Sequence, residues 1–301
     1  MISLLRKFSR LGPKESFRRG FNKYIGPHVL RFRFKDAPIY QNPSVTELEQ
    51  IELKLKQQGL EITNLHLGVI GFETFNERFP FPPDYHGGPE GGVWTEKLLE
   101  HFIAHELCGL AEFEPGDRYI DVAGSASPWA SMLREHGIEA YSVDLAYVEQ
   151  FSALDYYLQA DATDMPFEDA SVRACSLQCA YEMFNGDDDR LFLDECSRVL
   201  RPGGVAVIVP LYMHTRHCGY ASPEYFGKGY ADPGATEFIN WHAMCVPFSR
   251  KYSAGLLRER ILEPARQTGL APTLYRLANK SEFGSEVYCH FILVLKKEGA
   301  S

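Results

Sequence analysis

The sequence lacks several features that would place it in a specialised class of protein. Its 301 residues have a mean hydropathy of −0.24 and contain no apolar run long enough to span a bilayer, so a transmembrane anchor is not expected. The seven cysteines are scattered and include no Cys-x-x-Cys pair, which argues against a disulfide framework and against a zinc site of that kind. Such cysteines suit a reducing, cytoplasmic location.

Positive charge is scarce outside the N-terminal region. Residues 1–36 carry ten Lys and Arg against two acids, a net +8, which leaves 21 basic against 38 acidic residues, or −17, for the rest. An acidic body repels phosphate, so no nucleic-acid partner is expected. The basic arm is interleaved with apolar side chains, which is compatible with peripheral contact to an anionic membrane. A poorly ordered N-terminus and a transit peptide are the alternatives.

Two stretches precede the predicted main domain. Residues 44–58 predict a helix, because a Ser followed three positions later by Glu forms a capping box ahead of an apolar pattern. Residues 73–92 contain four prolines and four glycines and predict an irregular loop. We therefore expect a basic arm and helical extension over residues 1–92 and one domain over residues 93–301.

From residue 94 onward, predicted helices and strands alternate. This alternation predicts βαβ units and hence an α/β, Rossmann-like sheet that is mostly parallel and has helices on both faces. The last two strands are short and close together, so antiparallel pairing at a sheet edge is expected. The predicted strands are 118–123, 139–145, 156–160, 172–179, 205–211, 273–277 and 287–296; the predicted helices are 95–110, 128–136, 187–200 and 254–268, and Pro-Gly-Gly at 202–204 is interpreted as a helix stop.

Three acidic residues fall at the ends of successive predicted strands. Asp121 precedes a turn of small residues and a helix N-terminus, Asp144 closes the second strand, and Asp161 follows the third. Ligands of parallel sheets bind at this edge, where small residues let a ligand approach the backbone. An acid twenty positions beyond Gly124 suits ribose hydroxyls. Each acid alone is more often a solvated loop residue, but the three in this order predict an adenosine site.

Two runs carry a family resemblance. DMPFEDASV at residues 164–172 and DECSRVLRPGG at residues 194–204 resemble the class I S-adenosylmethionine-dependent methyltransferases, in particular the type 11 group. The resemblance covers residues 94–297 and implies a seven-stranded sheet with the last strand antiparallel, S-adenosyl-L-methionine as cofactor, and no metal. It also implies that the methionine part faces Asp121, Ala123, Gly124 and Ser125, the ribose faces Asp144, the adenine faces Asp161 and Ala162, and Cys179 with Tyr181 lies beside the methyl group.

The turn after the first strand departs from the family pattern. The pattern places glycine at three positions that are Ala123, Ser125 and Ser127 here, with Gly124 between them. Alanine and serine are small enough to keep the turn open, although they adopt a positive φ less readily than glycine. Cofactor binding is still expected at this turn.

The segment 212–252 predicts the substrate side. It holds nine aromatic residues in 41, or 22% against 13% for the chain, and aromatic faces stack on sugars and other flat groups. These aromatics are equally compatible with a lid that has its own small core. His214, His217 and His242 are candidate general bases, because histidine can take a proton from a hydroxyl near neutral pH. No metal site is predicted.

The sequence therefore predicts a cytoplasmic, S-adenosylmethionine-dependent methyltransferase that acts on a hydroxyl of a carbohydrate or small-molecule acceptor. The basic arm suggests a lipid-linked glycan near a membrane, and the runner-up acceptor is a soluble metabolite with a phenol or carboxylate. Two other classes stay open. A nucleotide-binding oxidoreductase fits because the strand, turn and second-strand acid also suit a dinucleotide. A non-catalytic cofactor-binding module of the same fold is the other alternative.

Overall fold

The computed structural model describes residues 30, 32–124, 127–146, 149–151 and 153–299. The described residues fall into two compact units. The smaller unit contains those up to Asn42 together with Cys218–Ser249, and the larger contains those from Pro43 to His217 and from Arg250 onward. The predicted division at residue 92 stays a prediction, and nearly all of the basic arm lies outside the described residues.

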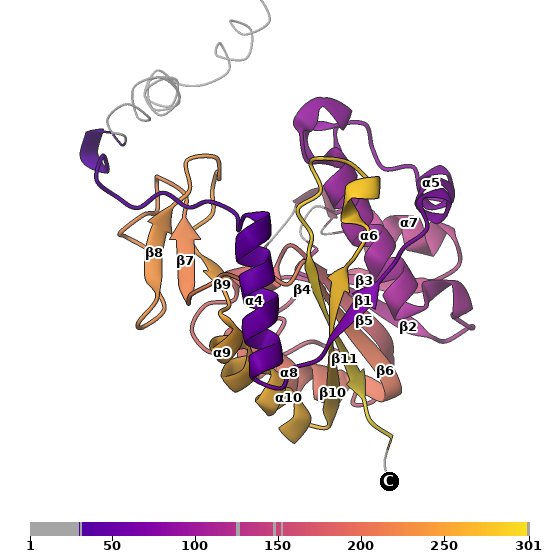
Figure 1. The fold of residues 1–301 in the computed structure, drawn as a ribbon. Coiled ribbons are helices and arrows are strands. Elements are labelled where there is room, and N and C mark those ends of the chain that lie inside the picture. The colour runs from indigo at the N-terminus through magenta and orange to yellow at the C-terminus, as the bar shows by residue number, and fades with distance from the viewer. Residues whose placement is uncertain (1–29, 31, 125–126, 147–148, 152, 300–301) are drawn as a thin grey trace, which may run out of the picture. The chain divides into compact units, whose positions relative to one another are not determined.

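The larger unit is built around an eight-stranded sheet in the order β1-β10-β11-β6-β5-β2-β3-β4 (Figure 1). β11 is antiparallel to both of its neighbours, and the other neighbouring strands pair in parallel. The predicted α/β fold with an antiparallel last strand is therefore confirmed, and β1 adds an eighth strand at the edge. The strands are β1 (Ile62–Leu65), β2 (Arg118–Val122), β3 (Glu139–Asp144), β4 (Tyr157–Gln159), β5 (Val172–Gln178), β6 (Leu200–Val209), β10 (Leu270–Leu277) and β11 (Phe291–Lys297).

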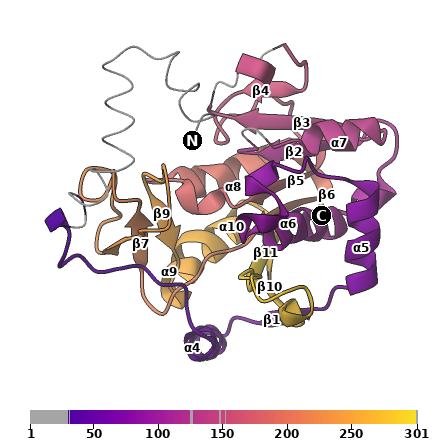
Figure 2. The same ribbon diagram turned by 90° about the horizontal axis from the view of Figure 1, so that it is seen from above.

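Helices cover both faces of this sheet, and each face has its own apolar core (Figure 2). Side chains of β2 alternate between the two cores: Tyr119 belongs to one, and Ile120 and Val122 belong to the other. Burial on both faces is what a parallel sheet requires. One face carries α4 (Val45–Gln57), α8 (Asp188–Val199), α9 (Ala254–Leu257), a π-helical turn (Arg258–Leu262) and α10 (Glu263–Gln267); the other carries α5 (Val69–Arg78), α6 (Trp94–Cys108) and α7 (Trp129–Glu135).

The predicted start of α4 is confirmed, and α5 moves one predicted boundary. The side chain of Ser44 accepts a hydrogen bond from the Glu47 amide, and the Glu47 carboxylate accepts one from the Ser44 amide at 2.9 Å. The loop predicted from residue 73 begins instead after α5, at Phe79. Phe75 of α5 packs against Phe102 of α6 with ring centroids 5.3 Å apart, and this burial extends the helix into a stretch whose prolines all lie further along the chain.

The Pro-Gly-Gly run at residues 202–204 does not end a helix. α8 already ends at Val199, and the run lies inside β6, where the pairing with β5 shifts register. A Cβ on Gly204 would lie 2.8 Å from the carbonyl oxygen of Arg201 and 3.0 Å from that of Arg173. The glycine is therefore needed for a close approach between backbones in an irregular strand, which sequence punctuation alone does not distinguish from a helix stop.

The smaller unit contains β7 (Cys218–Ala221) and β8 (Thr236–Ile239), which pair in parallel. These strands belong to a three-stranded sheet with β9 (Ser249–Lys251), the strand in which the chain passes to the larger unit. Ile39 forms a β-bridge with Ile239 and so joins the N-terminal segment to this unit. No helix in the described part of the chain is both long and apolar enough to cross a membrane.

Aromatic residues of the predicted lid pack on one another within the smaller unit. The ring of Tyr220 lies 4.6 Å from that of Tyr40, and the rings of Tyr230 and Phe248 meet edge-on at 5.1 Å. Offset and edge-on aromatic pairs of this kind stabilise a small core. The structure thus shows the alternative in which these aromatics serve the lid's own packing.

Candidate functional site

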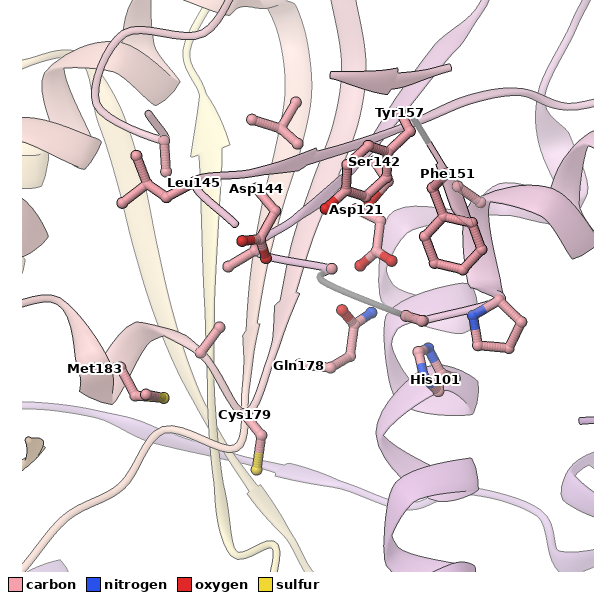
Figure 3. A pocket seen from close by; sticks show the side chains of 18 of the residues that line it. His101, Asp121, Ser142, Asp144, Leu145, Phe151, Tyr157, Gln178, Cys179 and Met183 are labelled. Atoms are coloured by element: carbon pink, nitrogen blue, oxygen red, sulfur yellow. The ribbon is translucent and has the colours of Figure 1, made fainter. Parts of the chain in front are cut away.

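A cavity of about 1070 Å³ lies in the larger unit, at the edge where the parallel strands end. Figure 3 shows the side chains of Asp121, Asp144, Gln178 and Cys179 reaching into it from the strand ends, with His101 approaching from α6. The ends of β2, β3, β4 and β5 and one side of α6 therefore form its walls. Ligand sites of open α/β sheets occupy this place.

The structure brings most of the predicted cofactor residues together in this cavity. Ser125 lies outside the described residues. Tyr181 is not among the described lining residues, because its ring is buried in the core and its hydroxyl donates to the carbonyl oxygen of Asp189 at 2.7 Å. Their roles toward a ligand stay predictions. The predicted residues that line the cavity are Asp121, Ala123, Gly124, Asp144, Asp161, Ala162 and Cys179.

The end of β2 exposes polar atoms that lack partners. Asp121 is 1% exposed, and neither its Oδ2 atom nor the Oγ atom of Ser142 has a hydrogen-bond partner among the described residues. Burial, together with the negative charge of Asp144, raises the pKa of Asp121 to about 8. A Cβ on Gly124 would lie 2.6 Å from Asp121 Oδ2 and 2.7 Å from Ser142 Oγ. Buried polar atoms of this kind call for a ligand that supplies donors or positive charge.

The other two strand-end acids are held by their own turns. Asp144 Oδ1 accepts a hydrogen bond from the amide of Ala146 at 2.6 Å. Asp161 Oδ1 accepts from the amide and the hydroxyl of Thr163, at 2.9 and 2.8 Å. These local bonds fix each carboxylate where its strand ends. We refer to Asp121, Asp144 and Asp161 as the strand-end acids.

Two backbone positions at the cavity are strained. Ala123 has φ 56° and Cys179 has φ 53°, the left-handed region that costs a residue with a side chain about 1–2 kcal/mol. Each is held by a backbone bond: Ala123 donates to Val143 at 2.7 Å and Cys179 donates to Val209 at 3.0 Å. Such strain persists where surrounding structure imposes it, and it gathers at functional sites. Ala123 is the first glycine position of the family pattern, so this chain keeps the turn's geometry without the glycine.

A second wall of the cavity is a buried polar cluster on α6, which sequence analysis missed. Lys97 Nζ donates to both carboxylate oxygens of Glu100, at 2.9 and 3.1 Å, and to Cys179 Sγ at 2.7 Å. The Cys179 thiol donates to Glu100 Oε1 at 3.4 Å. Lys97 is 8% exposed and Glu100 1%. We call Lys97, Glu100 and Cys179 the α6 cluster.

Burial and pairing set the charge states in the α6 cluster. Burial raises the pKa of the Glu100 carboxyl, and the neighbouring Lys97 ammonium only partly opposes this. Burial, with the charge of Glu100, raises the pKa of the Cys179 thiol to about 12. Burial lowers the pKa of Lys97, but its contacts with Cys179 and Glu100 outweigh burial and hold that pKa well above its usual value. Lys97 is therefore an ammonium and Cys179 a neutral thiol near pH 7.

A tyrosine and a histidine complete this side of the cavity. Tyr85 lies in the short 3₁₀ turn Tyr85–Gly87, and its hydroxyl is hydrogen-bonded to His101 Nε2 at 2.8 Å. Burial lowers the pKa of His101 to about 3, so its ring is neutral. Burial, with the charge of Asp121, raises the pKa of the Tyr85 phenol far above 10. The pair therefore supplies neutral hydrogen-bonding groups.

The three predicted histidines are not among the described residues that line the cavity, which corrects their expected position. After β6 the backbone bonds to Phe291 and then to Tyr252, whose carbonyl accepts from the His214 amide at 2.9 Å, and this path takes the chain along the core. Burial lowers the pKa of His214. His217 ends the same stretch, and His242 belongs to the smaller unit.

Comparison with known proteins identifies the region that holds the strand-end acids. Residues 120–208 match the family model described as a methyltransferase domain. The malonyl-[acyl-carrier protein] O-methyltransferase of Serratia marcescens is 28% identical over 126 residues, 40% of this chain and 49% of that protein. The chain thus spans about half the length of this curated relative.

Solved methyltransferase structures resemble the chain more distantly. The 1,6-didemethyltoxoflavin-N1-methyltransferase of Burkholderia thailandensis, solved with S-adenosylhomocysteine, is 14% identical with a TM-score of 0.46, covering 79% of this chain and 94% of that one. An S-adenosylmethionine-dependent methyltransferase from Clostridium acetobutylicum is 13% identical with a TM-score of 0.43, covering 66% and 91%. The family match over β2 to β6 and the sequence relative carry the assignment: the chain belongs to the class I S-adenosylmethionine-dependent methyltransferases.

Proposed function

We propose that this protein transfers the methyl group of S-adenosylmethionine to a hydroxyl oxygen of a small acceptor. The observation that carries the proposal is the end of β2, where the buried Asp121 Oδ2 and Ser142 Oγ lack partners among the described residues around a glycine that admits no side chain. When bound, the cofactor supplies an electrophilic methyl carbon on a positively charged sulfur. The chain's own task is to hold that cation and to align the acceptor.

The charge of the cavity fits this cofactor. Among the described lining residues, Lys97 supplies the one ammonium or guanidinium group, and the two lining histidines have lowered pKa values. A cleft lined by one sign of charge concentrates ligands of the opposite sign. The lining carboxyl groups belong to Asp84, Glu100, Asp121, Asp144, Asp161 and Asp188.

Each strand-end acid has a proposed partner in the cofactor. Asp144 accepts the two ribose hydroxyls, and Asp161 with Ala162 binds the adenine. Asp121, whose carboxyl is buried and has a raised pKa, binds the ammonium of the methionine part next to Gly124. A charged donor offsets the cost of a buried carboxylate, so Asp121 is the acid that gains most from this ligand.

The cavity has room for an acceptor as well. Sites for one drug-sized ligand range over about 300–1,000 Å³, and this cavity of about 1070 Å³ exceeds that range. A carbohydrate hydroxyl belongs to the proposed acceptor class. Contact of the basic arm with an anionic membrane is a separate proposal, supported by the charge of +8 over residues 1–36. It predicts salt-dependent co-sedimentation with anionic vesicles, and full-length protein that stays in solution at low salt contradicts it.

Calorimetry tests the proposed function. The wild type should bind S-adenosylmethionine and S-adenosylhomocysteine and should not bind NAD, which separates the proposal from the oxidoreductase alternative. Asp144→Ala should weaken binding by about 1.5–3 kcal/mol, the value of hydrogen bonds to a charged group. Asp194→Ala, which removes an exposed carboxylate on α8, is the matched control. Wild type that binds neither sulfur ligand contradicts the function, and unchanged affinity in Asp144→Ala removes this residue from the site.

A further inference from the structure

The proposed reaction leaves one group unassigned. A hydroxyl must lose its proton when its oxygen is methylated, so the acceptor side needs a proton acceptor. The described lining of the cavity away from the strand-end acids offers six titratable side chains for this task. These are Tyr85, His86, Lys97, Glu100, His101 and Cys179.

Four of these side chains are poor proton acceptors near pH 7. Lys97 already carries its proton, and Tyr85 and Cys179 hold theirs because burial raises their pKa values. His101 is neutral, but its lowered pKa makes it too weak a base to draw a proton from a hydroxyl. Two candidates are left, one carboxylate and one imidazole.

Glu100 and His86 differ in what a proton would do to them. His86 is exposed, and the nearby Lys97 ammonium opposes a second positive charge, as the lowered pKa of His86 reflects. Glu100 is a buried carboxylate, so a proton removes a charge that burial disfavours. Lys97 and Cys179 hold its carboxylate through three hydrogen bonds at the cavity wall.

We propose that Glu100 takes the proton of an uncharged hydroxyl acceptor, and that Lys97 and Cys179 are positioning residues that hold its carboxylate beside the end of β5. This inference rests on the proposed function and goes beyond it by naming the catalytic residue and the acceptor's charge. The acceptor oxygen forms a bond to the methyl carbon, and the methyl–sulfur bond breaks with its electron pair left on sulfur. The hydroxyl proton passes to a Glu100 oxygen and then to solvent.

The same electrostatics select the class of acceptor. A carboxylate or phosphate acceptor has no hydroxyl proton to transfer near neutral pH, and it would enter a cavity whose lining holds six carboxyl groups against one ammonium. Lys97 is already bonded to both oxygens of Glu100, so it is committed to that carboxylate. An alcohol or phenol enters without this repulsion and brings the proton that Glu100 accepts.

The environment of Glu100 determines the pH dependence. Its protonation when no acceptor is bound blocks the reaction, so kcat should fall as the pH drops through the Glu100 pKa, which burial places above its usual value. The titratable groups that surround Glu100 are Glu96 and Lys97 on α6, Tyr85 in the 3₁₀ turn, Cys179 and Glu182 after β5, Tyr212 after β6, and Tyr288 and Cys289 before β11.

The experiment compares full-length wild type, Glu100→Gln, His86→Ala and a control. Formation of S-adenosylhomocysteine is followed with phenol and benzyl alcohol as uncharged acceptors and with benzoate as the anion of matched size. Glu100→Gln should lower kcat by about 10²–10⁴-fold, keep the wild-type affinity for S-adenosylhomocysteine and lose the fall in kcat at low pH. Glu106→Gln, an exposed glutamate on the same helix, should match the wild type.

A second variant guards against misfolding. Glu100→Asp keeps the charge that pairs with Lys97 but withdraws the carboxylate by one methylene. It should therefore stay folded, lower kcat and retain the fall in kcat at low pH, which a merely structural loss would not reproduce.

Several results overturn the proposal. They are an unchanged kcat in Glu100→Gln, a loss of kcat in His86→Ala in its place, and methylation of benzoate but of neither uncharged acceptor. Wild type that binds S-adenosylhomocysteine and methylates neither phenol nor benzyl alcohol also counts against it. Wild type that does not bind S-adenosylhomocysteine contradicts the proposed function itself, which keeps the two failures distinct.

Discussion

The strand-end acids and the α6 cluster line one cavity but are assembled in different ways. Asp144 and Asp161 accept hydrogen bonds from residues two positions further along the chain. In the α6 cluster, Glu100 meets a thiol 79 positions away, and that thiol is also 2.9 Å from the hydroxyl of Tyr212. Short-range contacts leave a pattern in the sequence, whereas contacts between distant segments do not.

The two groups also differ in how much they depend on each other's charges. The carboxylates of Asp144 and Asp161 lie in turns at the ends of their strands. Glu100 and Lys97 are buried, and each would be an uncompensated charge without the other. The strand-end acids should therefore affect ligand binding first, and the α6 cluster should affect folding as well as chemistry.

The largest expected effect follows from removal of one partner of that buried pair. Lys97→Met leaves Glu100 without its ammonium, and the free energy of unfolding in urea should fall by about 3–5 kcal/mol. The control is Arg118→Met, which breaks an ion pair with Glu139 whose side chains are 38% and 34% exposed and should change stability by about 0–1 kcal/mol. Equal effects of the two substitutions would remove the contrast between buried and exposed charge.

A methyl group at the turn should act on the strand-end acids. In Gly124→Ala the new Cβ would lie 2.6 Å from Asp121 Oδ2 and 2.7 Å from Ser142 Oγ, so the carboxylate must shift. Affinity for S-adenosylhomocysteine should fall about 10²-fold in calorimetry, the equivalent of lost hydrogen bonds to a charged group. Gly255→Ala is the control, since its Cβ would meet only Gln58 at 3.7 Å. Wild-type affinity in Gly124→Ala would place the ligand elsewhere.

Stability should depend on pH through a buried carboxyl on α6 that does not line the cavity. Burial raises the pKa of Glu96 from 4.5 to about 8. Between these values the folded chain holds a proton that the unfolded chain has released, so the free energy of unfolding should decrease as the pH rises through this window. Glu96→Gln should flatten the curve, measured by urea unfolding from pH 4.5 to 8, and Glu106→Gln should leave it unchanged. A curve that rises across the window would contradict the raised pKa.

The smallest expected effect concerns backbone strain. Ala123 has φ 56°, so Ala123→Gly relieves a left-handed alanine, while glycine adds entropy to the unfolded chain. The net gain in unfolding free energy should be about 0.5 kcal/mol, seen as a higher midpoint in urea. The same change in a helix, Ala104→Gly in α6, should cost about 1 kcal/mol. A loss of stability in Ala123→Gly would show that the turn does not strain the alanine.

Much of the fold was predictable because its signals are local. The seven predicted strands are present with boundaries shifted by a few residues, and the capping box at Ser44 forms as expected. The errors have a common origin. β1 owes its place to pairing with β10, more than 200 residues away, and α5 extends to Arg78 because its aromatic face is buried against α6.

The site divides along the same line. By itself the sequence determined which residues end the parallel strands, since alternation of strands and helices and the order of the acids are properties of neighbouring residues. It could not determine that Lys97 and Glu100 face the cavity, because an amphipathic helix pattern does not say which polar residues are buried. Tertiary structure decided this by bringing Cys179 beside α6, and it likewise took His214 away by bonding its backbone to Tyr252. A buried charge is stable only where distant segments supply its partner, and that pairing exists only in the folded chain.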